Sequence, residues 1–325
     1  MSFSPARRLN SLSGKAPDRY QPHLLHHQGR TYLETNCYTD IIIELLHACG
    51  YEPLAVLGHL VRMDFEGDQW MFFKPSPEDL ELLFGIDIHE MQPYRPLPQQ
   101  IAEQLELGRT IIVELDSWHL PDTASTSYRS EHVKTSIAAD AIDIERQTLR
   151  YFHSAGLYEL RGEDYRGVFR MGEFPADVLP PYTELVRFDA GPKLEGERLR
   201  EAALGVLLRH LEKRPRDNPF TRFGDSLGRE LPALLEWGLD DYHAYAFATV
   251  RMAGSAFEVA ASYVRWLLGD DALAAAHAMQ EIVDGCKALS FRLARRRRFD
   301  PAPLIDSLAD AWTRAIEAVA EAVGR

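Results

Sequence analysis

A cysteine and a histidine in this sequence have the setting that thiol chemistry requires. Cys37 begins a predicted helix in the stretch LETNCYTDIIIELLHACG, with Asn36 as its predicted N-cap. The positive end of a helix favours the thiolate, which is the nucleophilic form of cysteine. His132 begins a predicted strand in SEHVKTSIAADAI, and an imidazole can take up and return a thiol proton. The pair predicts a nucleophile and its base, although free cysteines are also often simply buried.

A third group must orient the imidazole, and the sequence offers two candidates. The predicted hairpin returns His153 toward His132, opposite about residues 135–137, and a bulge or a longer turn would close the remaining gap. Asp116, which ends the preceding strand RTIIVELD, is the alternative. Asp140 is excluded, because eight residues of strand place it roughly 26 Å from His132. We rank His153 slightly above Asp116 and keep both.

The elements that must position these residues differ between the two halves of the chain. Residues 1–30 are predicted to be irregular. Helices in SPEDLELLFGI and LPQQIAEQLELG alternate with the strand and the hairpin up to about residue 190. Helical periodicity then continues almost to the end, with helices at about 196–213, 242–267, 271–297 and 301–323. The sequence predicts an α+β domain over 31–190 and an all-helical domain over 191–325.

Composition and charge restrict the class of protein. The 325 residues are 46% hydrophobic and 26% charged, as in a soluble globular protein. The net charge of −13 argues against a general nucleic-acid binder, and no apolar run approaches the roughly 18 residues of a membrane span. Three cysteines without zinc spacing, and no export signal, predict a cytoplasmic protein with no metal site. A basic patch in FRLARRRRFD suits an acidic partner; it contains Arg292, Arg295, Arg296 and Arg298.

Several stretches together resemble a known family. They are ETNCYTDIIIELLHACGYEP, DFEGDQWMFFKPSPEDLELLFGIDIHEM, VELDSWHLPDT, YRSEHVKTSIAADAID, YFHSAGLYEL and VRMAGSAFEVAASYVRWL. With them, nearly the whole chain resembles the bacterial family catalogued as domain of unknown function 1839. More distantly, the layout resembles butirosin biosynthesis protein H, an acyltransferase that moves an aminoacyl group from an acyl carrier protein to an amine. It also resembles the papain-like peptidase domains of bacteriocin exporters.

This resemblance implies a fold, a reaction and partners. It implies a papain-like domain with Cys37 as nucleophile and His132 as base, and His153 stands where relatives have an acidic or amide residue. Relatives place a glutamine before the cysteine for the oxyanion hole; it is absent here, so Asn36 or the Cys37 backbone N–H would serve instead.

The implied reaction moves an aminoacyl group from a phosphopantetheinyl carrier protein to a small amine or amino-acid acceptor, through a Cys37 acyl-enzyme. The carrier brings the phosphopantetheine arm, so no bound cofactor is expected, and the basic patch would dock the acidic carrier. The alternatives are a thioesterase or peptidase of the same fold, or a non-catalytic module that binds the carrier protein.

Overall fold

The computed structural model describes residues 11–172 and 179–324, which divide into two compact units. Unit 1 contains the described residues up to Leu24, Cys37–Pro53 and Leu80–Lys193. Unit 2 contains Leu25–Asn36, Leu54–Asp79 and the described residues from Leu194 onward. Of the predicted irregular segment 1–30, residues 1–10 lie outside the described part of the chain.

The two units are interleaved along the chain, whereas the sequence predicted a single boundary near residue 190. The second segment of unit 2 carries aromatic residues that pack on the helices of the C-terminal half. The ring of Trp70 lies 4.7 Å from that of Phe220, and the ring of Phe65 lies 5.4 Å from that of Phe223. This segment therefore belongs to the unit in which its apolar side chains are buried, and not to its neighbours in sequence.

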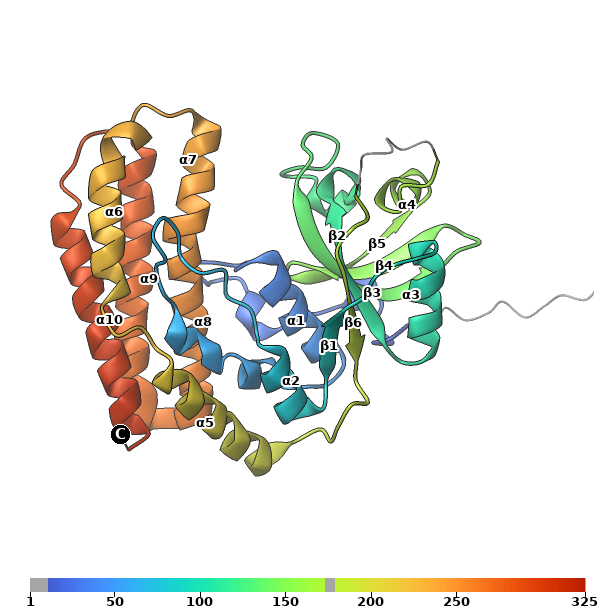
Figure 1. The fold of residues 1–325 in the computed structure, drawn as a ribbon, viewed down its shortest axis with the longest axis horizontal. Helices are drawn as coiled ribbons and strands as arrows, with labels where there is room; N and C mark the ends of the chain where they lie inside the picture. The colour runs from blue at the N-terminus through green and yellow to red at the C-terminus, as the bar shows by residue number, and fades with distance from the viewer. Residues whose placement is uncertain (1–10, 173–178, 325) are drawn as a thin grey trace, which may run out of the picture. The chain divides into compact units, whose positions relative to one another are not determined.

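Unit 1 is built on one antiparallel sheet in the order β1-β6-β2-β3-β4-β5 (Figure 1). The strands are β1 (Asp87–Glu90), β2 (Thr110–Asp116), β3 (Lys134–Asp143), β4 (Thr148–His153), β5 (Gly156–Arg161) and β6 (Thr183–Arg187). The predicted strand and hairpin are confirmed as β2 and β3–β4, and the register shifts between Ala139 and Ala141 as a bulge would require. The short strands β1, β5 and β6 were not predicted, because runs of four to six residues carry little periodicity.

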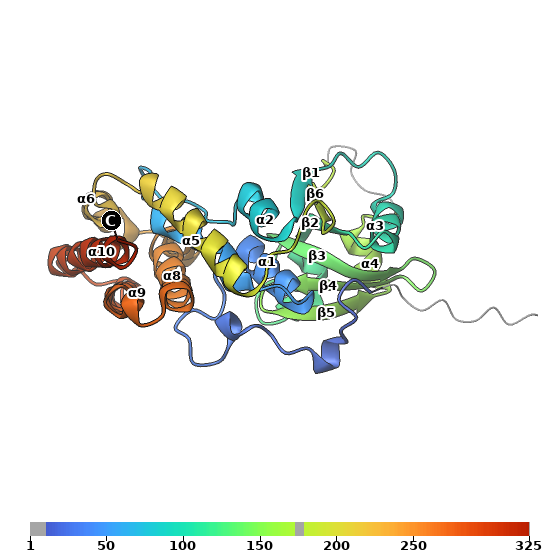
Figure 2. The same ribbon diagram turned by 90° about the horizontal axis from the view of Figure 1, so that it is seen from below.

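Helices cover the two faces of this sheet (Figure 2). On one face, α1 (Cys37–Ala48) packs against β3, β4 and β5. On the other face, α3 (Leu97–Glu106) and α4 (Glu163–Val168) share a hydrophobic core with the strands. Ile137 and Ala139 of β3 belong to that second core, so odd-numbered residues of β3 before the bulge point away from α1 and even-numbered ones point toward it.

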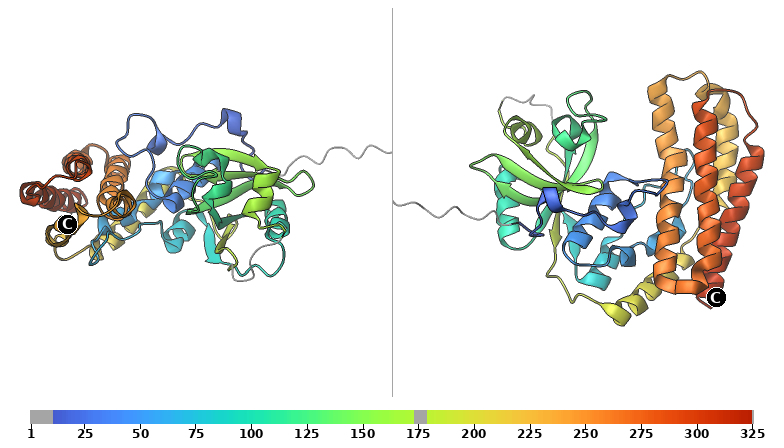
Figure 3. Two further views of the ribbon diagram at one scale, coloured as in Figure 1. Left: turned by 90° about the horizontal axis from the view of Figure 1, so that it is seen from above. Right: turned by 180° about the vertical axis from the view of Figure 1, so that it is seen from behind.

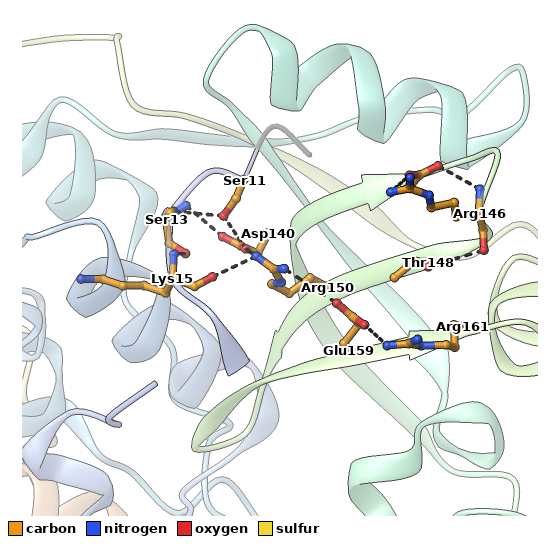
Figure 4. Close-up of polar contacts among 11 residues, drawn as sticks. Ser11, Ser13, Lys15, Asp140, Arg146, Thr148, Arg150, Glu159 and Arg161 are labelled. Atoms are coloured by element: carbon orange, nitrogen blue, oxygen red, sulfur yellow. Dashed lines mark hydrogen bonds and ion pairs between the residues drawn. The ribbon is translucent and has the colours of Figure 1, made fainter. Parts of the chain in front are cut away.

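An N-terminal segment is attached to β3 through one buried carboxylate (Figure 4). Asp140 is completely buried and accepts hydrogen bonds from the Ser11 hydroxyl (2.8 Å) and the Ser13 backbone N–H (2.9 Å). Arg150 lies 3.7 Å from the same carboxylate and also donates to the carbonyl of Lys15. Asp140 therefore has a structural role, which explains a buried acid in the middle of a strand.

Unit 2 is helical in its C-terminal part (Figures 1 and 3). Its helices are α5 (Gly196–Glu212), α6 (Pro219–Leu234), α7 (Leu239–Ala246), α8 (Met252–Leu268), α9 (Leu273–Ala294) and α10 (Ala302–Ala322). Helix α9 packs against α8 and α10, and α10 also packs against α6. The mixed sheet-and-helix part followed by a helical part confirms the coarse fold prediction.

Two short helical elements complete this description. Helix α2 (Pro77–Phe84) begins at its predicted cap, where the Asp79 N–H donates to the Ser76 hydroxyl. The helix predicted over 242–267 forms as α7 and α8 joined by a π-turn, Phe247–Arg251. Within the described ranges, none of the helices has both the length and the apolar character needed to cross a membrane.

Candidate functional site

Cys37 is the first residue of α1, so the prediction that it lies in the first turn of a helix is confirmed. Helix α1 buries nearly every side chain from Tyr38 to Ala48, including the polar Thr39, Asp40 and Glu44, while Cys37 at its end stays partly exposed. Its sulfur lies 3.9 Å from the Ser136 hydroxyl of β3. This contact places the thiol at the helix N-terminus and against the α1 face of the sheet.

A row of polar side chains extends from this point along the α1 face of the sheet. Ser136 stands opposite Glu114 of β2, and Lys134 stands opposite Asp116. Because alternate residues of a strand share a face, these four side chains lie on the side of Cys37. The Lys134 ammonium donates to Glu114 at 2.7 Å, so the middle of the row is held by an ion pair.

His132 lies at the far end of this row and is paired with Asp116. The Asp116 carboxylate lies 2.6 Å from His132 Nδ1, and its other oxygen accepts the Trp118 backbone N–H at 3.0 Å. The imidazole stacks on the Trp118 ring with centroids 4.6 Å apart and planes 10° apart. The side chain of His132 is still 71% exposed. Asp116 and Trp118 therefore orient the ring, while Nε2 has no partner among the described residues.

His153 belongs to a different network on the opposite face of the sheet. Its Nε2 lies 2.8 Å from the Thr135 hydroxyl, and its Nδ1 lies 2.5 Å from Asp122. Thr135 and Ser136 are consecutive residues of β3, so their side chains point to opposite faces. The ranking of His153 above Asp116 is corrected by these contacts: Asp116 orients His132, while His153 packs away from Cys37 with Tyr151, which also donates to Asp122.

Cys37 and His132 share a face of the sheet without contact. The residue of β3 at the sulfur is Ser136, and His132 precedes it by four residues, or roughly 13 Å of extended chain. Among the described residues, no hydrogen bond joins the imidazole to the thiol. The alternation of side chains along β3 could be predicted from the sequence, but the position along β3 at which the N-terminus of α1 packs could not.

A buried carboxylate that binds the residue after Cys37 was not predicted. Glu184 of β6 is only 5% exposed and accepts hydrogen bonds from the phenols of Tyr38 (2.6 Å) and Tyr182 (2.8 Å). Burial and this hydrogen bond raise the pKa of Tyr182 to about 12, and the pKa of Tyr38 is also raised, so both phenols remain donors. The only sequence signal was Tyr38 itself, next to Cys37.

The remaining predicted site residues lie in unit 2. The side-chain amide of Asn36 donates to the Phe73 carbonyl at 3.0 Å, and the residue is buried. Helix α9 ends at Ala294, so most of the arginine run follows the helix. Arg292, Arg295 and Arg298 are exposed, whereas Arg296 donates to the backbone carbonyls of residues 235 and 237. Three of the four arginines are thus available to a partner.

No group of His, Cys, Asp and Glu that could hold a metal ion is found within the described part of the chain.

Comparison with known proteins assigns the chain to a family. No curated protein matches the sequence. Residues 21–188 match the DUF1839 N-terminal domain, and residues 196–321 match the DUF1839 C-terminal domain. These two matches cover most of the sequence, and the chain belongs to the DUF1839 family.

Proposed function

We propose that this chain is a cysteine-dependent acyltransferase of papain-like fold that moves an aminoacyl group from a carrier-protein thioester to an amine. The observation that carries the proposal is the partly exposed thiol of Cys37 at the N-terminus of α1. The helix packs on an antiparallel sheet, and the same face of that sheet carries the His132–Asp116 pair. A helix-borne cysteine against such a sheet supports the papain-like assignment.

The first step is a thioester exchange at Cys37. The sulfur of Cys37 forms a bond to the acyl carbon, the bond from that carbon to the phosphopantetheine sulfur breaks, and the thiol proton passes to the departing thiol. Both sides of the exchange hold one thioester and one thiol, so the step is nearly balanced and depends mainly on orientation. The helix N-terminus favours the thiolate that starts it.

The second step transfers the acyl group to the amine. The amine nitrogen bonds to the acyl carbon, the sulfur of Cys37 leaves, and the proton lost by nitrogen passes through a base to that sulfur. The base in this proposal is His132, whose Nδ1 is held by Asp116 while Nε2 is exposed. Because His132 is separated from the sulfur by roughly 13 Å of strand, the acceptor or the loop before β3 has to bring the two together.

The carrier protein is the proposed donor. Carrier proteins are generally acidic, and Arg292, Arg295 and Arg298 offer exposed positive charge on a chain of net charge −13. Replacing these three with glutamate should weaken carrier binding and leave the alkylation of Cys37 by iodoacetamide unchanged. Arg296 is left in place because it holds backbone carbonyls within unit 2.

Intact-protein mass spectrometry with an aminoacylated carrier protein tests the covalent step. The expected result is a mass increase of one aminoacyl group that disappears in Cys37→Ala and persists in Cys49→Ala. Cys49 is the matched control, because burial raises the pKa of its thiol to about 12. Adding amines should release the group as an amide. Release of the aminoacyl group by water alone would identify the protein as a thioesterase. Formation of the acyl-enzyme from a peptide would identify it as a peptidase.

A second candidate is a non-catalytic module that binds the carrier protein. The separation of Cys37 from His132 favours it, since a working thiol–imidazole pair is held within hydrogen-bond reach. It predicts no adduct, together with carrier binding that Cys37→Ala leaves unchanged.

A further inference from the structure

A cavity lies entirely within unit 2 and takes no part in the proposed acyl transfer. It has a volume of about 610 Å³, within the usual range for small-molecule sites. Its walls come from α6, from the turn that follows it, from α7 with the π-turn, and from the loop before Trp70. The lining side chains used below are Asp68, Glu230, Trp237, Asp241 and Tyr245.

Two aromatic rings form a corner of this cavity. The rings of Trp237 and Tyr245 meet edge to face, with centroids 6.4 Å apart and an interplanar angle of 75°. Both residues line the cavity, and the face of an aromatic ring attracts an ammonium group, as in aromatic cages. Arg296 holds the backbone at this corner by donating to the carbonyls of Leu235 and Trp237.

Carboxylates supply the charge of the cavity. Asp68, Glu230 and Asp241 line it, and no lysine, arginine or histidine does. None of the three forms an ion pair within the described part of the chain. Glu230 accepts a hydrogen bond from the Ser226 hydroxyl at 3.1 Å and interacts with the Tyr245 phenol. Aromatic rings and three carboxylates without an ion-pair partner among the described residues favour a cation over an anion or a neutral molecule.

The Tyr245 phenol adds a polar group beside Glu230. Its oxygen is buried, has no hydrogen bond of standard geometry to the described residues, and lies close enough to the Glu230 carboxylate to be affected by its charge. Burial and the nearby charge of Glu230 raise the pKa of Tyr245, so the phenol stays protonated. The phenol oxygen can accept a hydrogen bond from a primary ammonium group, and the ring can receive a quaternary one on its face.

The π-turn holds the remaining wall in place. A π-turn inserts an extra residue into a helix and leaves a carbonyl available to other groups. The carbonyl of Ala248 accepts the Trp70 backbone N–H at 3.2 Å, and the Thr249 hydroxyl donates to the Tyr245 carbonyl at 2.6 Å. The loop that carries Asp68 is thus attached to the helix that carries Tyr245, so the cavity is preformed.

We propose that this cavity binds an organic ammonium ion, with the aromatic corner of Trp237 and Tyr245 receiving the cationic group and the three carboxylates balancing its charge. The site is distinct in residues from the Cys37 region. It therefore stands or falls independently of the acyltransferase proposal.

Isothermal titration calorimetry of the full chain tests this with matched probes. Choline and 1,4-diaminobutane are each compared with a neutral counterpart of similar shape, 3,3-dimethylbutan-1-ol and butane-1,4-diol. At least one ammonium compound should bind with a Kd below about 10 mM, and its neutral counterpart should bind at least about fivefold more weakly. The preferred compound then tells whether the ligand is a quaternary or a primary amine.

Substitutions locate the binding. Trp237→Leu and Glu230→Gln should each raise the Kd of the ammonium compound by about fivefold or more. Asp225→Asn makes the same charge change as Glu230→Gln at an exposed position of α6 outside the cavity and should leave binding unchanged. The proposal is overturned if neither ammonium compound binds, if the neutral counterparts bind within that factor, or if both lining variants bind as the wild type does. Should a variant fail to fold, the charged-against-neutral comparison in the wild type decides.

Discussion

The buried imidazole of His59 makes unit 2 sensitive to acid. His59 is 5% exposed, with its ring 6.4 Å from that of Phe73 and 6.3 Å from that of His210. Its Nδ1 lies 3.1 Å from the Val56 carbonyl, which only an N–H can satisfy, while Nε2 has no partner among the described residues. Protonation of Nε2 would bury a charged donor without an acceptor.

The size of the effect follows from the pKa. Burial lowers the pKa of His59 from 6.5 to about 4. In the unfolded chain the imidazole takes up its proton near pH 6.5, so between pH 6.5 and 4 the unfolded state binds more protons than the folded state. The free energy of unfolding therefore decreases as the pH is lowered through that window. Each pH unit costs about 1.4 kcal/mol, which gives a loss of about 2 kcal/mol between pH 7.5 and 5.0 and about 3 kcal/mol in full.

Asp79 in the same cluster acts at lower pH. Burial alone would raise the pKa of Asp79, but the hydrogen bond from His210 and nearby positive charge outweigh it and lower that pKa. Its contribution is present above about pH 4 and is lost below that value. The window from pH 6.5 to 4 therefore separates the effect of His59 from that of Asp79.

The assay is urea unfolding followed by tryptophan emission at pH 7.5 and 5.0. This emission reports mainly on unit 2, which holds four of the five tryptophans: Trp70, Trp237, Trp266 and Trp312. His59→Asn keeps an amide N–H for the Val56 carbonyl and cannot titrate. The variant should be less stable at pH 7.5, but its loss between the two pH values should be about 2 kcal/mol smaller than in the wild type.

Exposed His27, also in unit 2, supplies the control, and His27→Asn should retain the wild-type dependence on pH. The reasoning is refuted if His59→Asn loses as much stability as the wild type over this window. If the variant does not fold, NMR titration of the wild-type imidazole replaces it, and a His59 ring that becomes protonated above pH 6 would refute the argument equally.

Three further predictions concern unit 1. Gly85→Ala should lower the free energy of unfolding by about 3 kcal/mol or more, because φ is +64° and the added methyl would lie 2.1 Å from a backbone carbonyl oxygen. Gly108→Ala, where φ is +72° but the space is open, should lower it by about 1 kcal/mol, and urea unfolding measures both. Iodoacetamide at pH 7.5 should label Cys37 and leave Cys49 unmodified, since burial raises the pKa of Cys49 to about 12, and peptide mapping that finds equal labelling would contradict this. Asp140→Asn should cost about 2 kcal/mol and speed amide hydrogen exchange in residues 11–15, and unchanged exchange there would show that the carboxylate does not hold that segment.

The sequence was informative wherever a local pattern decides the structure. The β-branched run of β2 and the hairpin of β3 and β4 form as predicted, and the chain after residue 190 is helical. Helix α6 was not among the predicted helices, and the helix predicted over 242–267 is divided by a π-turn. The cap at Ser76 and the position of Cys37 in the first turn of α1 follow from neighbouring residues alone. A bulge was considered as a way to bring His153 to His132; one forms between Ala139 and Ala141, but His153 contacts Thr135 instead.

The candidate site depended on information that lies far apart in the chain. Whether Asp116 or His153 faces His132 depends on which face of the sheet each side chain points to. A shift of one residue in the strand register moves a side chain to the other face. Asp116 shares the face of Cys37, whereas His153 contacts Thr135 on the reverse face. The partner of the Cys37 thiol, Ser136, depends on how far along β3 the helix packs.

By itself, then, the sequence determined the family, the types of element and the helix N-terminus at which Cys37 lies, because these rest on contacts within a few residues. Only the tertiary structure decided which side chains meet: Asp116 with His132, Glu184 with Tyr38, and the segment around Trp70 with the helices of unit 2. Those meetings are set by strand register, by the face of the sheet and by burial of apolar surface between segments distant in sequence, and none of these is a property of a local stretch.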